Sequence, residues 1–338
     1  MGSAKFTFPA VKGIQAKMEY YIAMVPLECI PKLFTFKDDN MAPELRFQRT
    51  LNKARIPEMR DYILSNPDSY VFSALTASID GEITFTTHQD SSDIGLLSIP
   101  MTAKMLINDG QHRRAAIEAA LKRNPALKYE HISIVLYHDI GLKRSQQIFS
   151  DLNRFAIRPT KSLNILYDNR DNMSILVKDA ISRIPSFEKL IDKEHTSIPN
   201  RSIALFTLSS IHKGTMELLK DSTLSTKEQL ELASRFWTTV YNNMLDWQAV
   251  ASGNTKSSVI RKETLSPLSI TMRALGHVGR ILIASYPNQW HNRLEALQFT
   301  DWNKTNPLWH NGIVVNNSVQ LSHATQALMI KILSEILL

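Results

Sequence analysis

The hydrophobic pattern of this chain changes near residue 158. Before that point, strand-like stretches such as Tyr20 to Val25 and Ile132 to His138 are mixed with helix-like ones. Beyond it, apolar residues recur at helical spacing over residues 163–184, 203–220, 227–247, 268–285 and 319–338. We therefore expect an α+β (mixed α/β) domain over residues 1–158 and a mainly helical domain over residues 159–338. The alternative is that Arg158-Pro159-Thr160 forms a turn inside one compact body.

Local signals add detail to the first domain. Residues 42–64 are helical in pattern, with a break expected at Pro57 because proline lacks the amide hydrogen that a helix interior needs. Residues 70–78 and 83–87 are expected to pair as a β-hairpin around Asp80-Gly81. A further helix is expected over residues 143–153.

Composition narrows the class of protein. Lys and Arg number 39 against 32 Asp and Glu in 338 residues, and this basic balance favours an acidic partner. The single cysteine, Cys29, excludes an internal disulfide and any cysteine-based zinc or iron-sulfur site, which fits a reducing cytoplasm. No segment is apolar for long enough to span a bilayer, and residues 1–12 lack the apolar core of a signal peptide, so we expect a cytoplasmic protein without a membrane partner.

The segment from Leu106 to Ile117 predicts an anion site. An apolar strand stops at Asp109-Gly110, and an amphipathic helix follows over residues 111–123. The unpaired amides and the dipole of a helix start favour phosphate or carboxylate, and Arg113 and Arg114 can add charge-assisted hydrogen bonds. Asp109 would repel a phosphate unless it caps the helix, holds a metal ion or accepts a hydrogen bond from a sugar or base.

Three groups of basic residues are candidates for DNA contacts, and each has a structural alternative. The alternatives are a solvated helix face for the first group and a helix junction for the second; in the third, Gly276 and Gly279 between the charges favour a closely packed helix pair, while the aligned basic side chains stay a candidate for DNA contact. The groups are Arg46, Arg49 and Lys53; Arg154, Arg158 and Lys161; and Arg261, Lys262, Arg273 and Arg280, with His277 between the last two.

Several common catalytic motifs are absent. The chain has no P-loop, no Gly-x-Ser-x-Gly, no His-Glu-x-x-His and no Gly-x-Gly-x-x-Gly sequence, which disfavours the enzyme classes that these motifs define. His112 is the one histidine inside a suggestive cluster, where it is either a structural hydrogen-bonding residue or a proton carrier.

The string Asp109-Gly110-Gln111-His112-Arg113 is the signature of the DGQHR-domain family, and the chain resembles its DndB branch of DNA sulfur modification (phosphorothioation) proteins. The resemblance spans most of the chain. Its other supporting segments are Phe8–Ala16 with Tyr20–Leu27, Gln48–Arg55, Phe149–Ser162 and Leu275–Gly279.

This resemblance implies a bacterial DNA-binding protein that represses transcription of the genes that install sulfur in the DNA backbone. It also implies a ParB/sulfiredoxin-like N-terminal core, in which the strand, turn and helix around Asp109, Gly110, Gln111, His112 and Arg113 hold nucleotide phosphates. The expected partners are promoter DNA, other DNA sulfur modification proteins and further copies of the chain, and the expected location is the nucleoid.

Three functions therefore stay open. The first is a DNA-binding regulator with a nucleotide or phosphate site at the motif. The second is an ATP-hydrolysing enzyme with DNA-nicking activity, in which Arg113 and Arg114 hold phosphates, Asp109 binds Mg²⁺ or positions water, and His112 moves a proton. The third is an interaction protein that uses amphipathic helices such as residues 319–338, although packing within the chain explains those helices more simply.

Overall fold

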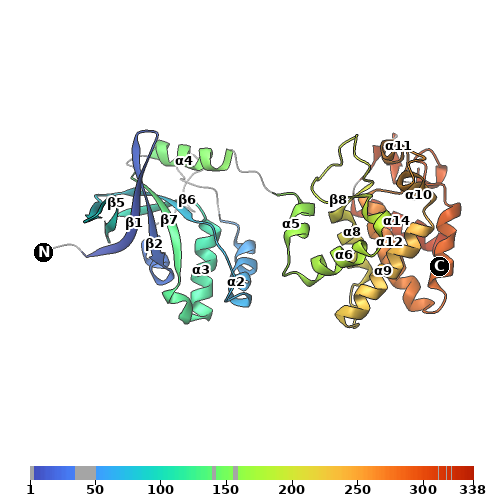
Figure 1. Ribbon diagram of the computed structural model, residues 1–338, viewed down its shortest axis with the longest axis horizontal. Coiled ribbons are helices and arrows are strands. Elements are labelled where there is room, and N and C mark those ends of the chain that lie inside the picture. Colours follow the sequence, from blue (N-terminus) through green and yellow to red (C-terminus); the bar gives the residue numbers. More distant parts are fainter. Residues whose placement is uncertain are drawn as a thin grey trace. The chain divides into compact units, whose positions relative to one another are not determined.

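A computed structural model describes residues 4–34, 51–138, 142–154, 159–310, 312–316, 318–320 and 322–338, and the fold is α+β (Figure 1). The chain forms two compact units, Met1–Ile157 and Arg158–Leu338. Among the helices in these ranges, none combines the length and apolar character needed to cross a membrane.

The first unit is built on a seven-stranded mixed sheet in the order β4-β5-β1-β2-β7-β3-β6. Strands β3 and β7 run parallel, and the other neighbouring pairs are antiparallel. The strands are β1 (Lys5–Gln15), β2 (Met18–Pro26), β3 (Leu75–Asp80), β4 (Thr84–His88), β5 (Ser91–Pro100), β6 (Lys104–Asp109) and β7 (His131–His138).

Alternation along the strands decides which face of this sheet is buried. In β2, Tyr21, Ala23 and Val25 point into the core, while Ile22 and Met24 between them are exposed. Helices contribute further residues to the same core, and these helices are α1 (Ile30–Leu33), α2 (Ile56–Ser65) and α3 (Gln111–Arg123). Helix α4 (Leu142–Arg154) lies against β6.

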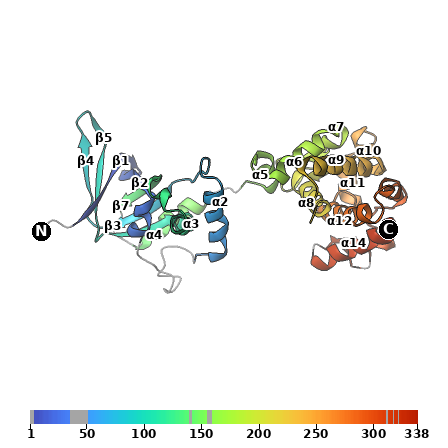
Figure 2. The ribbon, with the colours of Figure 1, turned by 90° about the horizontal axis from the view of Figure 1, so that it is seen from below.

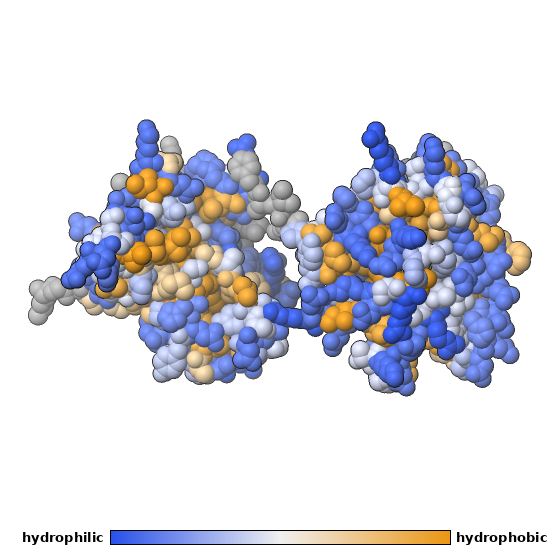
Figure 3. Space-filling view, in the orientation of Figure 1, coloured by the Kyte–Doolittle hydropathy of each residue, from blue (hydrophilic) through white to orange (hydrophobic). Residues whose placement is uncertain are grey.

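The opposite face of the sheet keeps apolar side chains at the surface. Val11 of β1 is paired with Ile22 of β2 on one side and with Ile94 of β5 on the other, and all three are exposed. Figure 3 shows apolar residues gathered over β1, β2 and β7. This part of the sheet therefore has an apolar surface that no described helix covers.

The hairpin expected around Asp80-Gly81 is wrong. Strand β3 pairs with β6 and β7, and β4 pairs with β5, so the two strands flanking the turn are not neighbours. The reason is burial: Leu75 to Ile79 of β3 are buried on both faces, which places this strand inside the sheet, whereas β4 is largely exposed and forms an edge.

Pro57 lies in the first turn of a helix that begins at Ile56. A 3₁₀ turn, Lys53–Arg55, leads into α2 at Ile56, and Pro57 occupies the first turn, where its missing amide hydrogen costs nothing. The first part of the expected helix, residues 42–50, lies outside the described residues.

The second unit is a helical domain with two short two-stranded sheets, β8 (Ile191–Asp192) with β9 (Phe206–Thr207) and β10 (Val314–Val315) with β11 (Ser318–Val319). Helix α12 packs against both α8 and α14 (Figure 2). The helices are α5 (Lys161–Tyr167), α6 (Asn172–Ser182), α7 (Pro185–Glu188), α8 (Leu208–Leu218), α9 (Thr226–Asn242), α10 (Leu245–Ala251), α11 (Ser257–Glu263), α12 (Ser269–Ser285), α13 (Trp290–Arg293) and α14 (His323–Leu337).

Aromatic residues fill the centre of this domain. Phe187 stacks on Trp237 and Trp247, with ring centroids 5.9 and 5.8 Å apart. The helix expected over residues 163–184 is divided between α5 and α6, because Asp168 accepts hydrogen bonds from two amides in the connection and Asp171 caps α6. The helix expected over residues 268–285 is confirmed by α12.

Candidate functional site

The predicted strand, turn and helix of the motif are confirmed by β6, Gly110 and α3. Gly110 precedes α3 with φ of +99°, a left-handed conformation that favours glycine. A Cβ atom at this position would lie 2.5 Å from Cδ2 of Leu75, which is itself fully buried. The turn therefore requires glycine both for its backbone conformation and for its close contact with β3.

Arg113 points back into the protein from the first turn of α3. Its guanidinium forms an ion pair with Asp109 and donates hydrogen bonds to the carbonyl oxygens of Ser73 and Ala74, at 2.7 and 2.6 Å. The Arg113 side chain is only 14% exposed, whereas that of Asp109 is 48% exposed. Arg113 thus ties the motif to the segment that enters β3, and it neutralises the carboxylate at the mouth of the turn.

His112 of the motif and Arg114, which follows the motif, also have partners within the unit. Arg114 lies 3.2 Å from Glu118, one turn further along α3. The Nε2 atom of His112 accepts a hydrogen bond from the backbone amide of Asn52 at 3.1 Å, so in this arrangement Nε2 carries no proton. His112 therefore holds the segment that leads into α2 beside the motif.

A cavity of about 160 Å³ opens at the start of α3. Asn108 and the motif residues 109–113 form one wall, α4 contributes Phe149 and Asn153, and Arg55 and Met59 come from the start of α2. Arg55 is exposed, and its guanidinium has no hydrogen-bond or ion-pair partner among the described residues. Sequence reasoning did not single out Arg55 as a site residue, although it ends one of the segments that carry the family resemblance.

Asn108 fixes the position of α4 against this cavity. Its buried side chain donates to the backbone oxygen of Ser145 on α4, at 3.2 Å, and accepts from the hydroxyl of Ser78 on β3, at 2.9 Å. Because both the donor and the acceptor of the Asn108 amide are hydrogen-bonded, this buried side chain holds α4 against β6 and β3.

The chemistry of the cavity is that of a small anion site. Helix α3 has no side-chain N-cap and no acidic residue in its first turn, so its dipole favours negative charge there. Arg55 supplies a cation at the same opening. The volume lies below the roughly 300–1,000 Å³ of pockets that enclose drug-sized ligands, so the cavity suits a phosphate group more than a whole nucleotide.

The first two groups of predicted DNA contacts are only partly described. Arg46, Arg49 and Arg158 lie outside the described residues. Lys53 is exposed in the 3₁₀ turn, and Lys161 is exposed at the start of α5. Arg154 is the last residue of α4 and already interacts with another residue.

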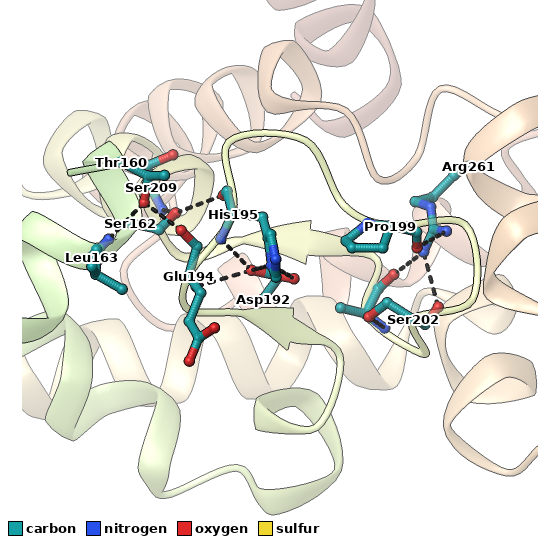
Figure 4. A network of polar contacts seen from close by, with 11 residues as sticks. Thr160, Ser162, Leu163, Asp192, Glu194, His195, Pro199, Ser202, Ser209 and Arg261 are labelled. Carbon is teal, nitrogen blue, oxygen red and sulfur yellow. Dashed lines mark hydrogen bonds and ion pairs between the residues drawn. The ribbon is translucent and has the colours of Figure 1, made fainter. Parts of the chain in front are cut away.

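Arg261 organises a loop of the helical unit (Figure 4). Its guanidinium donates to backbone oxygens of Pro199, Asn200, Ser202 and Ala204. The same network includes Asp192, which accepts hydrogen bonds from the amides of residues 194 and 195. The guanidinium of Arg261 is therefore occupied by carbonyl oxygens, whereas the neighbouring Lys262 is exposed.

Helix α12 carries the remaining predicted contacts. Arg273 bonds Glu217 of α8 at 2.7 Å, and His277 lies 3.7 Å from the same carboxylate. Although burial opposes it, the hydrogen bond from Arg273 holds the pKa of Glu217 below its ordinary value. The Nε atom of Arg280 is buried and has no hydrogen-bond partner among the described residues.

Sequence reasoning missed Lys213 of α8, which lies close to this group. Burial lowers the pKa of Lys213, and the nearby positive charges of Lys161 and Arg273 lower it further. Lys161 and Arg273, which belong to two different predicted groups, thus both lie near enough to Lys213 to lower its pKa, and neither group contained Lys213.

Comparison with known proteins identifies one family. A family model described as DndB, DNA-sulfur modification-associated, matches residues 8–338. No curated protein and no solved structure matches the chain. The ParB/sulfiredoxin-like core implied by the motif accordingly stays a prediction.

Proposed function

Because the chain belongs to the DndB family of DNA-sulfur modification-associated proteins, we propose that it binds promoter DNA of the modification genes and represses their transcription. Family membership supports a place in DNA sulfur modification. The regulatory role rests on what the resemblance of the motif and its flanking segments implies. The same proposal places the protein at the nucleoid, with promoter DNA, other modification proteins and further copies of itself as partners.

The observation that carries the DNA-binding part is the distribution of charge. Lys and Arg exceed Asp and Glu by five in residues 158–338, but only by two in residues 1–157. In the helical unit, Arg273 and Arg280 are seven residues apart and so lie on the same side of α12. Cations that neutralise backbone phosphates release counterions, which supplies most of the affinity of a protein for DNA.

The proposal is tested by titrating the purified protein into a labelled promoter fragment at 50 to 200 mM salt, beside an unrelated fragment of equal length. We expect tighter binding of the promoter fragment, with log K falling linearly against log salt by about 0.9 for each phosphate contacted. In cells, deleting the gene should raise transcription of the modification genes. Absence of DNA binding, or unchanged transcription, would contradict the proposal.

We further propose that the cavity beside α3 binds a phosphate group of a nucleotide such as ATP, with Mg²⁺ carried by the nucleotide. Arg55 and the N-terminal end of α3 favour this, because both place positive potential at one opening. The engaged side chain of Arg113 positions the turn and is not available to hold phosphate in this arrangement.

ATP hydrolysis, with or without nicking of DNA, is the alternative function of this cavity. It is favoured by the half-exposed Asp109 beside His112 at the cavity, where Asp109 would position water and His112 would accept a proton once its Nε2 had released the amide of Asn52. Arg55→Gln is a better test than a change of Asp109, because loss of Asp109 would leave Arg113 without its ion-pair partner.

We expect Arg55→Gln to weaken ATP binding, measured by calorimetry with Mg²⁺ present, by about tenfold, the loss of one charge-assisted contact of roughly 1.4 kcal/mol. Arg123→Gln, an exposed arginine at the other end of α3, should bind ATP as the wild type does. Release of inorganic phosphate, measured in the same samples, distinguishes hydrolysis from binding alone. Equal affinity of both variants would exclude the proposed role of Arg55.

A further inference from the structure

One face of α8 connects two other helices of the helical unit. Ser209, Lys213 and Glu217 are spaced four residues apart and so follow one another along this face. At one end, the amide of Ser209 donates to the hydroxyl of Ser162, which follows Lys161 in the first turn of α5 (Figure 4). At the other end, Glu217 is bonded to Arg273 of α12. Lys213 therefore lies between them.

Close contact of two helix backbones brings Arg273 to this position. Helices α8 and α12 cross at Gly214 and Gly276, where a Cβ atom on Gly276 would lie 1.9 Å from the backbone oxygen of Gly214. Because no side chain separates the helices at the crossing, residues beside it are held close together. Lys213 precedes Gly214, and Arg273 lies one turn before Gly276.

Lys213 is unusual among the lysines of this unit. Its ammonium group is half-buried and has no hydrogen-bond or ion-pair partner within the part of the chain that the structure describes. Lys178 of α6 shows the structural alternative, since its ammonium donates three hydrogen bonds, to the backbone oxygens of Leu166 and Asp168 and to Asn169, at 2.9–3.0 Å. A partly desolvated ammonium group near other cations is unfavourable by itself, and a bound anion would stabilise it.

We propose that Lys161, Lys213 and Arg273 form a binding site for one phosphate of the DNA backbone, with Lys213 at its centre. Lys161 and Arg273 contribute charge from the two flanking helices, and Glu217 positions the Arg273 guanidinium. A phosphate has several acceptor oxygens and can receive hydrogen bonds from all three side chains at once. This inference rests on the proposed binding of DNA and names the residues that perform part of it.

The test compares Lys213→Gln with Lys331→Gln in the full chain. Lys331 is an exposed lysine of α14, paired loosely with Glu335, so its change removes the same charge away from the site. Affinity for a duplex DNA fragment is measured by fluorescence anisotropy between 50 and 200 mM KCl. We expect Lys213→Gln to reduce the salt slope by about 0.9, the value of one phosphate contact, and Lys331→Gln to leave it unchanged.

Two further measurements separate the possible results. Lys213→Arg keeps the charge and should retain the wild-type slope, which a packing role for Lys213 would not predict. Thermal unfolding of each variant shows whether it is folded. If the wild type binds DNA and folded Lys213→Gln keeps its slope, the phosphate site is wrong while DNA binding stands. If the wild type shows no salt-dependent DNA binding, the proposed function fails and this site fails with it.

Discussion

The guanidinium of Arg113 forms an ion pair with the carboxylate of Asp109, the residue that ends β6 and begins the motif. Gly110 and the first two residues of α3 lie between them, so the pair closes a short loop of chain across the turn. The other donors of Arg113 reach Ser73 and Ala74 before β3. This ion pair therefore stabilises the opening of the cavity. It also gives a structural reason why Asp109 and Arg113 stand four residues apart in the motif.

Arg113→Gln is expected to destabilise the first unit by about 2–3 kcal/mol, since it leaves a carboxylate and two backbone oxygens without their donor. The half-exposed position of Asp109 keeps the cost below that of a fully buried pair. Urea unfolding followed by circular dichroism measures the change. Arg123→Gln, exposed at the far end of the same helix, should remain within about 0.5 kcal/mol of the wild type. Equal stability of the two variants would exclude the bracing role.

Gly110→Ala is expected to cost about 3 kcal/mol, because it combines left-handed strain with a collision against Leu75. Gly253 separates the two effects. It also has a positive φ, +80°, but no atom lies within 4 Å of the place where its Cβ would be. Gly253→Ala should therefore cost only the backbone strain, about 1 kcal/mol. Similar losses for both variants in the same urea series would show that the contact with Leu75 is unimportant.

Acidification is expected to destabilise the helical unit through His212. Burial lowers the pKa of His212 below 6.5, although the carboxylate of Asp171, 3.9 Å from its Nε2, opposes this. The unfolded chain then binds more protons than the folded one, so stability falls as pH drops through 6.5 towards the lower folded pKa, by at most about 1.4 kcal/mol per pH unit. The pKa of Asp171 is itself lowered, and that contribution is lost only at pH values around and below 3.8.

Unfolding free energies measured between pH 7.5 and 5.5 test whether stability falls on acidification. His212→Gln should make the pH dependence shallower in that interval, because it removes the group that takes up the proton on unfolding. His323→Gln, exposed at the start of α14, is the control and should keep the wild-type dependence. A wild type that gains stability on acidification would contradict the assignment.

Local periodicity was enough to predict the α+β class, the strand, turn and helix at Gly110, and α12. It failed for the partners of β3, because strand pairing depends on which residues are buried on both faces and not on the nearest turn signal. Asp80-Gly81 marks a real change of direction, yet β3 is buried between β6 and β7. Such pairing between distant segments leaves no local pattern to read.

The candidate site, like the fold, could be predicted from the sequence only where a local pattern determines it. The motif identified the turn, but spacing could not show whether Arg113 faces a ligand or the backbone before β3. Arg55 and Lys213 become notable only through neighbours on other elements, the wall of the cavity for one and the α8–α12 crossing for the other. Arg261 illustrates the converse, since a basic residue in a polar segment is occupied by four backbone oxygens.

The crossing of α8 and α12 connects stability to DNA binding, and Gly276→Ala tests that connection. The added methyl group cannot fit 1.9 Å from the oxygen of Gly214, so the helices must move apart. We expect a loss of about 2–4 kcal/mol in unfolding free energy. Separation of the helices should also draw Arg273 away from Lys213 and reduce the salt slope of DNA binding.

Ser285→Ala is the matched control, because Ser285 is exposed in the last turn of α12 and lies away from the crossing. It should preserve both the stability and the salt slope of the wild type. The slope is measured at a temperature where unfolding curves show Gly276→Ala to be fully folded, so that loss of binding cannot come from unfolded protein. A destabilised but folded variant with the wild-type slope would show that DNA binding does not depend on the distance between these helices.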